Sequence, residues 1–99
     1  MKQTVVVHPR VCERHPELSV EDVLAAWNNC LRSSRRSNGA IEDYVAVGID
    51  GKGRAIEMIA VPQKNNTWKI YHAMAPPTLR VLQDLGLYDR RKNEQSSKR

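Results

Sequence analysis

The sequence predicts a small α+β domain whose centre is a three-stranded antiparallel meander, and two patterns support this prediction. β-Branched and aromatic residues gather in three runs, at residues 44–49, 54–61 and 67–73, and short turn-forming segments separate the runs. Apolar residues also recur at helical spacing on both sides of this region. We therefore expect a sheet with helices packed on it.

The turns and faces of the predicted meander have local signals. Residues 50–53 contain two glycines, which adopt the positive φ angles of tight turns, and residues 62–66 form the second turn region. Both faces of the strands are rather apolar. We expect the middle strands either to be covered on both sides or to expose one face as a binding surface. Glu57 interrupts one face and is expected to mark its wetter side.

The strongest helix signal begins at Ser19, which resembles a capping box together with Asp22. An apolar face follows at positions i, i+3, i+4, i+7 and i+11, formed by Val20, Val23, Leu24, Trp27 and Leu31. This spacing predicts one long helix that fades between Arg32 and Ser37, before the stop signal Ser-Asn-Gly at residues 37–39.

Shorter elements complete the predicted fold. Residues 5–7 are β-branched and predict a short N-terminal edge strand, and residues 10–15 can form one to two helical turns. A C-terminal helix is expected to begin near residues 76–78 and to end at Gly86. Its apolar stripe consists of Leu79, Leu82 and Leu85.

Length and charge predict one domain at residues 1–88 and a basic tail at residues 89–99. The chain has 99 residues and a net charge of +5, of which +4 falls between Arg90 and Arg99. Because the tail has no apolar anchor after Tyr88, we expect it to be disordered. It could bind polyanions loosely, or it could serve solubility alone.

The sequence also predicts a cytoplasmic location. It contains no apolar run long enough to cross a membrane, and its N-terminus has no signal-peptide pattern. Cys12 and Cys30 fall in different predicted elements, which favours two buried free thiols over a disulfide. Free thiols are typical of a reducing compartment.

One group of basic and aromatic residues is chemically sufficient for RNA cleavage without a metal ion. The group comprises His8, Arg10, Arg14, His15, Tyr71 and His72. Such cleavage needs a base for the 2′-hydroxyl, an acid for the leaving oxygen and cations for the phosphorane charge. Histidine and arginine supply these roles near neutral pH. The structural alternative makes His72 a hydrogen-bonded sheet residue and Arg14 an ion-pair partner of Glu17 or Glu21.

A second basic cluster, Arg32, Arg35 and Arg36, is expected at the C-terminal end of the long helix. These residues either stabilise that helix end, where cations are favourable, or contact phosphates. No motif predicts a cofactor. The spacing of His8, Cys12 and His15 fits no standard zinc site, so we expect no metal.

Three segments resemble a known protein family. Residues 8–23, HPRVCERHPELSVEDV, resemble the opening segment of small bacterial proteins of the BrnT type and of a related family of domains of unknown function. Residues 44–54, YVAVGIDGKGR, are similar to a hairpin of BrnT toxins. Residues 68–73 lie where those proteins have a strand that leads into the final helix. The likeness covers roughly residues 5–87.

BrnT-like proteins belong to the RelE-like toxin superfamily, so the resemblance implies a RelE/BrnT-like α+β fold. It further implies a metal-independent ribonuclease that inhibits translation, with RNA as substrate and a cognate antitoxin protein as partner. Carried over by position, the opening segment supplies Arg10, Arg14 and His15, and the hairpin supplies Arg54. At the end of the third strand the family has basic residues, whereas this chain has Met74 and Ala75.

These observations together define the expected site. The expected catalytic residues are His72, His15 and Tyr71, and the expected RNA- or phosphate-binding residues are Arg10, Arg14, Arg54, Arg35 and Arg36. Either His72 supplies the function that the family's basic residues perform, or catalysis has been lost or changed. The competing hypothesis is therefore a catalytically inactive protein- or RNA-binding module. A homodimer that buries one sheet face is compatible with both hypotheses.

Overall fold

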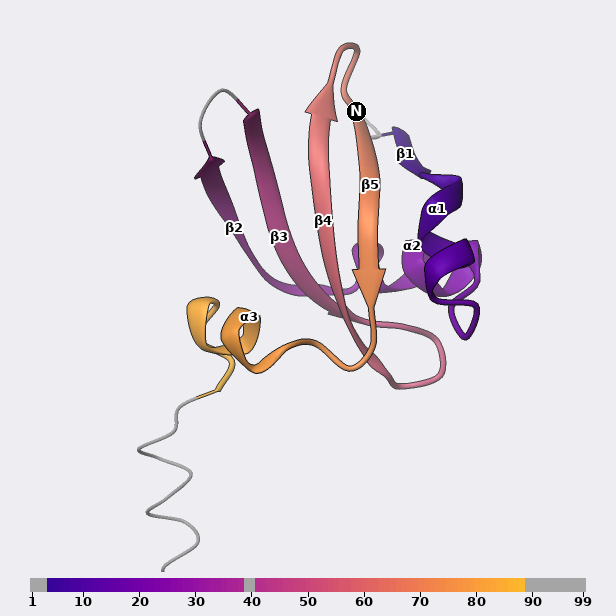
Figure 1. Cartoon of the computed structure of the whole chain (residues 1–99), viewed down its shortest axis with the longest axis vertical. Helices are drawn as coiled ribbons and strands as arrows, with labels where there is room; N and C mark the ends of the chain where they lie inside the picture. Colours follow the sequence, from indigo (N-terminus) through magenta and orange to yellow (C-terminus); the bar gives the residue numbers. More distant parts are fainter. Residues whose placement is uncertain (1–3, 39–40, 89–99) are drawn as a thin grey trace, which may run out of the picture.

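The computed structural model describes residues 4–38 and 41–88 and shows a five-stranded mixed sheet with three short helices (Figure 1). In chain order the elements are β1 (Thr4–Val7), α1 (Pro9–Arg14), α2 (Val20–Asn28), β2 (Cys30–Asn38), β3 (Ile41–Ile49), β4 (Ala55–Gln63), β5 (Thr67–Met74) and α3 (Leu79–Asp84). The strand order is β1-β5-β4-β3-β2, in which β1 is parallel to β5 and the other pairs are antiparallel. The predicted α+β class and the meander of β3, β4 and β5 are confirmed.

Helices lie on both faces of the sheet. In Figure 1, α3 lies in front of the sheet, whereas α1 and α2 lie at its right side and behind it. The larger core joins α1 and α2 to the sheet through Val11, Leu18, Val23, Ala26, Ala46, Ile56, Met58, Ala60, Ile70 and Ala73. The smaller core joins α3 to the other face through Val45, Val47 and Leu85. Burial on both faces explains why the middle strands are apolar on both sides.

The prediction of one long helix through Leu31 is wrong. α2 ends at Asn28, and Cys30–Asn38 forms β2, which pairs antiparallel with β3. Asn28, Asn29 and Cys30 are weak helix formers. Pairing with β3 also gives the backbone amides and carbonyls of residues 30–38 hydrogen-bond partners in the sheet. Leu31, expected on the apolar helix face, is 55% exposed. The arginines that follow it therefore lie on a strand and not at a helix terminus.

The start of α2 agrees with its sequence signal. The Ser19 hydroxyl accepts a hydrogen bond from the Asp22 amide, and the Asp22 carboxylate accepts one from the Ser19 amide, which completes the capping box. Later in the helix, α2 rests directly on β3 at Gly48. A Cβ atom at Gly48 would lie 1.8 Å from the Ala26 carbonyl oxygen, so this close approach requires glycine.

A β-bulge places two neighbouring side chains of β5 on the same face of the sheet. The register between β4 and β5 shifts between Ile59 and Ala60, because Ile59 pairs with His72 and Ala60 pairs with Ile70. The extra residue, Tyr71, reaches Asp43 on β3, while His72 reaches Glu57 on β4. Bulges commonly redirect side chains in this way. Tyr71 and His72 both face the α3 side of the sheet.

Two further expectations need correction. Glu57 does not mark a wet face, since it is only 4% exposed and accepts hydrogen bonds from the amide and hydroxyl of Thr78, the N-cap of α3. The thiols are both free, but Cys12 is half-buried and Cys30 is exposed, because Cys30 lies on the edge strand β2.

The remaining sequence predictions concern the tail and the membrane. The predicted tail at residues 89–99 lies outside the described residues. Within residues 4–38 and 41–88, no helix has the length and apolar character needed to cross a bilayer.

Candidate functional site

The candidate site lies where the bulge of β5 meets α1. A small cavity of about 180 Å³ opens there and is lined by His8, Arg10, Arg14 and Tyr71. Three of these residues come from the N-terminal segment and one from the last strand. The structure thus brings together most of the group that the sequence analysis selected as sufficient for RNA cleavage. The sequence alone could not show that these side chains lie close together in the folded protein.

α1 presents the two arginines of this cavity. His8 caps the helix through its Nδ1 atom, which accepts a hydrogen bond from the Arg10 amide at 3.1 Å. Arg10 and Arg14 are four residues apart, so they lie on the same side of the helix. Both are exposed, and within residues 4–38 and 41–88 neither guanidinium makes a hydrogen bond or an ion pair. Their donors are available to a ligand.

Tyr71 is held by an acid on β3. Its hydroxyl donates a hydrogen bond of 2.6 Å to Asp43, whose two carboxylate oxygens also accept from Arg36 at 3.0 Å each. The hydrogen bonds from Arg36 keep the pKa of Asp43 below its usual value. Burial and then the hydrogen bond to Asp43 raise the pKa of Tyr71. Tyr71 therefore keeps its proton at neutral pH and can position a ligand, but it is a poor general base.

His72 forms a close pair with a buried acid. Its Nε2 atom lies 2.9 Å from Glu57 Oε2. Burial opposes the charge on Glu57, but the Thr78 amide, His72 and the Thr78 hydroxyl outweigh that effect and leave the pKa of Glu57 lowered. An ionised Glu57 accepts a hydrogen bond from Nε2–H of His72, and in this tautomer the free lone pair of the ring lies on Nδ1. In that tautomer Nδ1 is a potential proton acceptor.

His15 lies beside His72 with its own acid. The centroids of the two rings are 6.5 Å apart and the rings are nearly perpendicular, at 89°. His15 Nδ1 lies 3.6 Å from a carboxylate oxygen of Glu17. Both histidine side chains are 29% exposed. The two imidazoles are therefore adjacent and solvent-accessible, and each has one ring nitrogen turned towards a glutamate. Neither histidine is among the residues that line the cavity of about 180 Å³; their chain neighbours Arg14 and Tyr71 are.

Three arginines that the sequence analysis assigned to phosphate binding lie outside this cavity. Arg54 donates to Asp50 at 2.8 Å, to Asp22 at 2.9 Å and to the Glu17 carbonyl at 3.2 Å. These contacts raise the pKa of Arg54, chiefly through Asp50. Arg36 reaches the cavity only indirectly, through Asp43 and Tyr71.

Arg35 lies on the opposite face of β2 from Arg36. Its guanidinium pairs with Glu42 at 2.6 Å, and both side chains are largely exposed. The basic cluster predicted at a helix end is thus divided between two faces of a strand.

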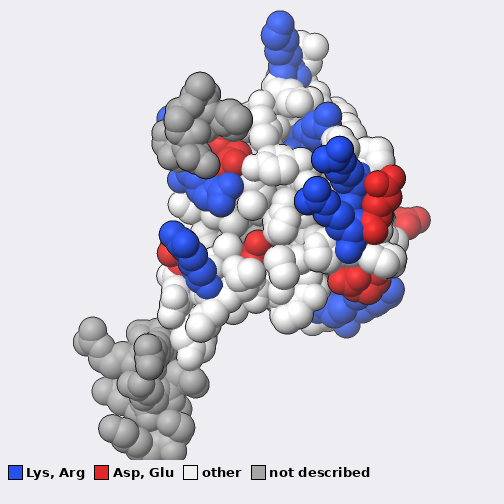
Figure 2. Space-filling view, viewed as in Figure 1, with Lys and Arg blue, Asp and Glu red and all other residues white. Residues whose placement is uncertain are grey.

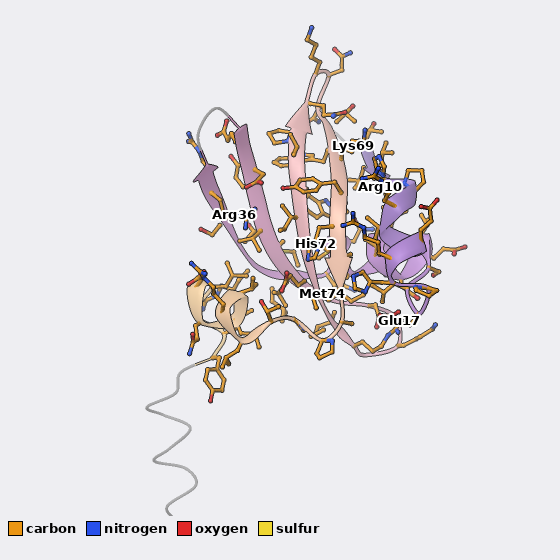
Figure 3. All side chains as sticks on the ribbon, in the orientation of Figure 1. Arg10, Glu17, Arg36, Lys69, His72 and Met74 are labelled. Carbon is orange, nitrogen blue, oxygen red and sulfur yellow. The ribbon has the colours of Figure 1, made fainter. Side chains whose placement is uncertain are left out.

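The surface that surrounds the cavity is basic. Figure 2 shows Lys and Arg side chains gathered on the right of this face, with Asp and Glu side chains directly beside and below them. In Figure 3, Lys69, His72 and Met74 follow one another along β5, Arg10 projects from α1, and Arg36 lies across the sheet on β2.

The sequence did not predict three residues at or beside the candidate site: Glu57, Asp43 and Lys69. An acid inside an apolar strand was a signal for Glu57 and Asp43, because a buried carboxylate needs a partner. Lys69 gave no signal beyond its charge.

The described part of the chain contains no group of three or more His, Cys, Asp or Glu side chains arranged to hold a metal ion. Comparisons with protein families, with curated proteins and with solved structures found no match for this chain.

Proposed function

We propose that this protein is a metal-independent ribonuclease of the small toxin type, whose active site comprises the cavity between α1 and β5 and the neighbouring pair His15 and His72. The observation that carries the proposal is the pair of perpendicular imidazoles, His15 and His72, at 6.5 Å. RNA cleavage through the 2′-hydroxyl needs one group to accept a proton and one to donate a proton on either side of a phosphate. Two neighbouring imidazoles meet that need, and Arg10 and Arg14, which have no partner within the described residues, are the cations closest to them in the proposal.

The proposed mechanism assigns each proton. His72 Nδ1 removes the proton of the 2′-hydroxyl, since Glu57 holds the opposite nitrogen as a donor. The 2′-oxygen forms a bond to phosphorus, the bond from phosphorus to the 5′-oxygen breaks, and His15 protonates the leaving oxygen. Arg10 and Arg14 stabilise the charge on the phosphorane oxygens. Tyr71 donates no proton in this scheme and acts as a positioning residue.

The order of elements is compatible with the family that the sequence resembles. A short strand, two helices, an antiparallel meander and a helix follow one another along the chain. We therefore extend the proposal to a RelE/BrnT-like fold, inhibition of translation in the cytoplasm and neutralisation by a cognate antitoxin protein.

The test is cleavage of a fluorescently labelled RNA by purified protein in the presence of EDTA. We expect His72→Ala and His15→Ala each to reduce the rate by about 100-fold or more, because general acid–base catalysis contributes about 10²–10⁴-fold. The control is Arg80→Ala, an exposed arginine on α3 that should leave the rate unchanged. Cleavage that is equal in wild type, His72→Ala and a buffer blank would overturn the proposal.

The second candidate function is a catalytically inactive RNA-binding module. Met74 favours it, since this residue pairs with Glu57 next to His72 at a position where the resembling family has basic residues. A protein that binds RNA through Arg10 and Arg14 but leaves it intact would establish this alternative.

A further inference from the structure

The face of the sheet opposite His72 contains a second cavity. It has a volume of about 300 Å³ and lies beyond the end of α2, between the helix and strands β2, β3 and β5. Its lining residues are Trp27, Cys30, Ser33, Tyr44, Ala46 and Trp68. We call it the aromatic cleft. The proposed cleavage reaction uses none of these residues.

Three aromatic rings form the wall of the aromatic cleft. The ring centroids of Trp27 and Trp68 are 5.6 Å apart, and those of Tyr44 and Trp68 are 5.0 Å apart with the two rings nearly perpendicular, at 79°. All three side chains are half-buried: Trp27 and Trp68 pack against the larger core with part of their surface, and the rest of each ring stays accessible. The cleft therefore offers π surface to a ligand from the solvent side.

The aromatic cleft suits one planar ring system better than a longer ligand. Its volume lies at the lower end of the range for small-molecule sites. Its walls are aromatic, and the Ser33 hydroxyl supplies a polar group at β2. Nucleobases are planar, carry polar edges and stack on tryptophan and tyrosine with about 1–3 kcal/mol per base.

A cation lies beside the aromatic cleft where a phosphate would follow a stacked base. Arg35 is the cross-strand partner of Tyr44 and lies on the same face as Ser33. Its ion pair with Glu42 joins side chains that are 63% and 46% exposed. Exposed ion pairs contribute little, so a phosphate can replace Glu42 at small cost.

We propose that the aromatic cleft binds a nucleobase of single-stranded RNA and that Arg35 contacts the adjoining phosphate. This inference rests on the proposed function for the identity of the ligand, and it adds a second subsite on the face opposite the cleavage site. The base is held there by stacking and is not cleaved.

Tryptophan fluorescence tests the inference directly, because the chain has two tryptophans and both line the aromatic cleft. The probes are a 2′-O-methyl hexa-adenylate, which the proposed reaction cannot cleave, adenosine 5′-monophosphate and tripolyphosphate. We expect the oligonucleotide to quench the fluorescence and tripolyphosphate to leave it unchanged. Quenching by the monophosphate at equal affinity would assign the site to free nucleotides and keep the base as ligand. Equal quenching by tripolyphosphate would overturn the inference.

A pair of serine variants separates the aromatic cleft from the rest of the surface. Ser33→Phe places a ring inside the cleft, whereas Ser34→Phe places the same ring on the opposite face of β2. We expect Ser33→Phe to weaken oligonucleotide affinity about tenfold and Ser34→Phe to have no effect. Unchanged affinity of a folded Ser33→Phe would contradict the proposal.

A chemical readout covers the case in which Ser33→Phe fails to fold. In a Cys12→Ser background the exposed Cys30 thiol is the remaining thiol, and a base in the aromatic cleft should slow its alkylation by iodoacetamide. An unchanged alkylation rate at saturating oligonucleotide would overturn the inference.

The cleavage assay identifies which proposal has failed. If the ribonuclease proposal alone is wrong, the oligonucleotide still quenches the tryptophans and RNA stays intact. If the base subsite alone is wrong, RNA is cut while fluorescence and alkylation do not change.

Discussion

Two arginine-containing regions of this molecule differ in how their charge is used. At the turn between β3 and β4, Arg54 is surrounded by Asp50, Asp22 and the Glu17 carbonyl. At the cavity between α1 and β5, Arg10 and Arg14 have no acidic partner within the described residues. The residue type is the same, but one region uses it to hold the fold together and the other leaves it available.

The difference follows from the burial of the acids. The Asp50 side chain has no exposed surface, and it accepts hydrogen bonds from the Lys52 and Arg54 amides as well as from the Arg54 guanidinium. A carboxylate in that position needs a cation, so the fold recruits one. α1 has no acidic residue in its first turn, and among residues 4–38 and 41–88 no carboxylate pairs with Arg10 or Arg14. Basic charge therefore indicates a binding surface only where the protein has no internal use for it.

The largest effect on folding is expected from Arg54→Met. This change leaves Asp50 and Asp22, both buried, without their main cation. The midpoint of thermal unfolding, followed by circular dichroism, should fall below that of every other variant described here. Lys52→Met is the control, because Lys52 is 66% exposed and lies 3.6 Å from Asp22. If both variants unfold at the wild-type temperature, the contrast between the two regions is lost.

The double variant Arg10→Ala/Arg14→Ala should weaken RNA binding and leave the stability of the fold unchanged. Each arginine contributes about 1.5 kcal/mol through charged hydrogen bonds to phosphate, so RNA affinity should fall about 100-fold at low salt. The slope of log affinity against log salt should become shallower by about 1.4, at about 0.7 per lost contact. The unfolding midpoint should not move. Fluorescence anisotropy with a labelled RNA measures affinity and slope, and an unaltered slope would contradict the assignment.

Glu57→Gln tests the acid behind His72, with an intermediate effect. The amide can still accept from Thr78, but the charge is lost, and we expect a loss of stability of about 1–2 kcal/mol at pH 7. The folded protein lowers the pKa of Glu57 from its usual 4.5. The stabilisation that ionised Glu57 gives the folded protein is thus complete above pH 4.5, and it is lost as the pH falls through the lower pKa of the folded state. The variant should therefore lose less stability than wild type on acidification below pH 4.5, as measured by urea unfolding. Parallel curves would exclude a stabilising charge on Glu57.

The smallest effect is expected from Arg80→Ala. Arg80 is exposed on α3 and, like Arg10 and Arg14, has no ion pair within the described residues. Unlike them, it lines neither the cavity between α1 and β5 nor the aromatic cleft. RNA affinity should change by less than twofold, and the free energy of unfolding should change by about 0.5 kcal/mol at most. A loss comparable to that of the α1 double variant would mean that unpaired charge alone, and not the cavity, binds RNA.

Much of the fold was predictable because its signals are local. The capping box at Ser19, the Gly-containing turn after Asp50 and the stop at Gly86, with φ at 73°, each involve residues only a few positions apart. The segment at residues 30–38 was mispredicted because its conformation depends on a distant partner, β3. Leu31 continued the helical spacing, and only strand pairing overrode it.

The candidate site was predictable in its members but not in its geometry. The chemistry of histidine, arginine and tyrosine selected Arg10, Arg14 and Tyr71 before any contact was known. Asp43 and Glu57 stood out in the sequence only as acids inside apolar strands, and their partners, Tyr71 and His72, are known only from the contacts in the folded protein. The placement of Arg54 in an ion-pair cluster likewise depends on acids from separate elements.

The sequence by itself determined the meander, the helix starts and the set of candidate site residues, because each depends on side-chain chemistry or on near neighbours. The tertiary structure alone decided that residues 30–38 become an edge strand and that His15 meets His72. It also decided that Arg54 is neutralised, whereas Arg10 and Arg14 have no acidic partner in the described part of the chain. These outcomes depend on groups that are far apart in the sequence. A buried carboxylate needs a cation beside it, and the free edge of a strand needs a hydrogen-bonding partner.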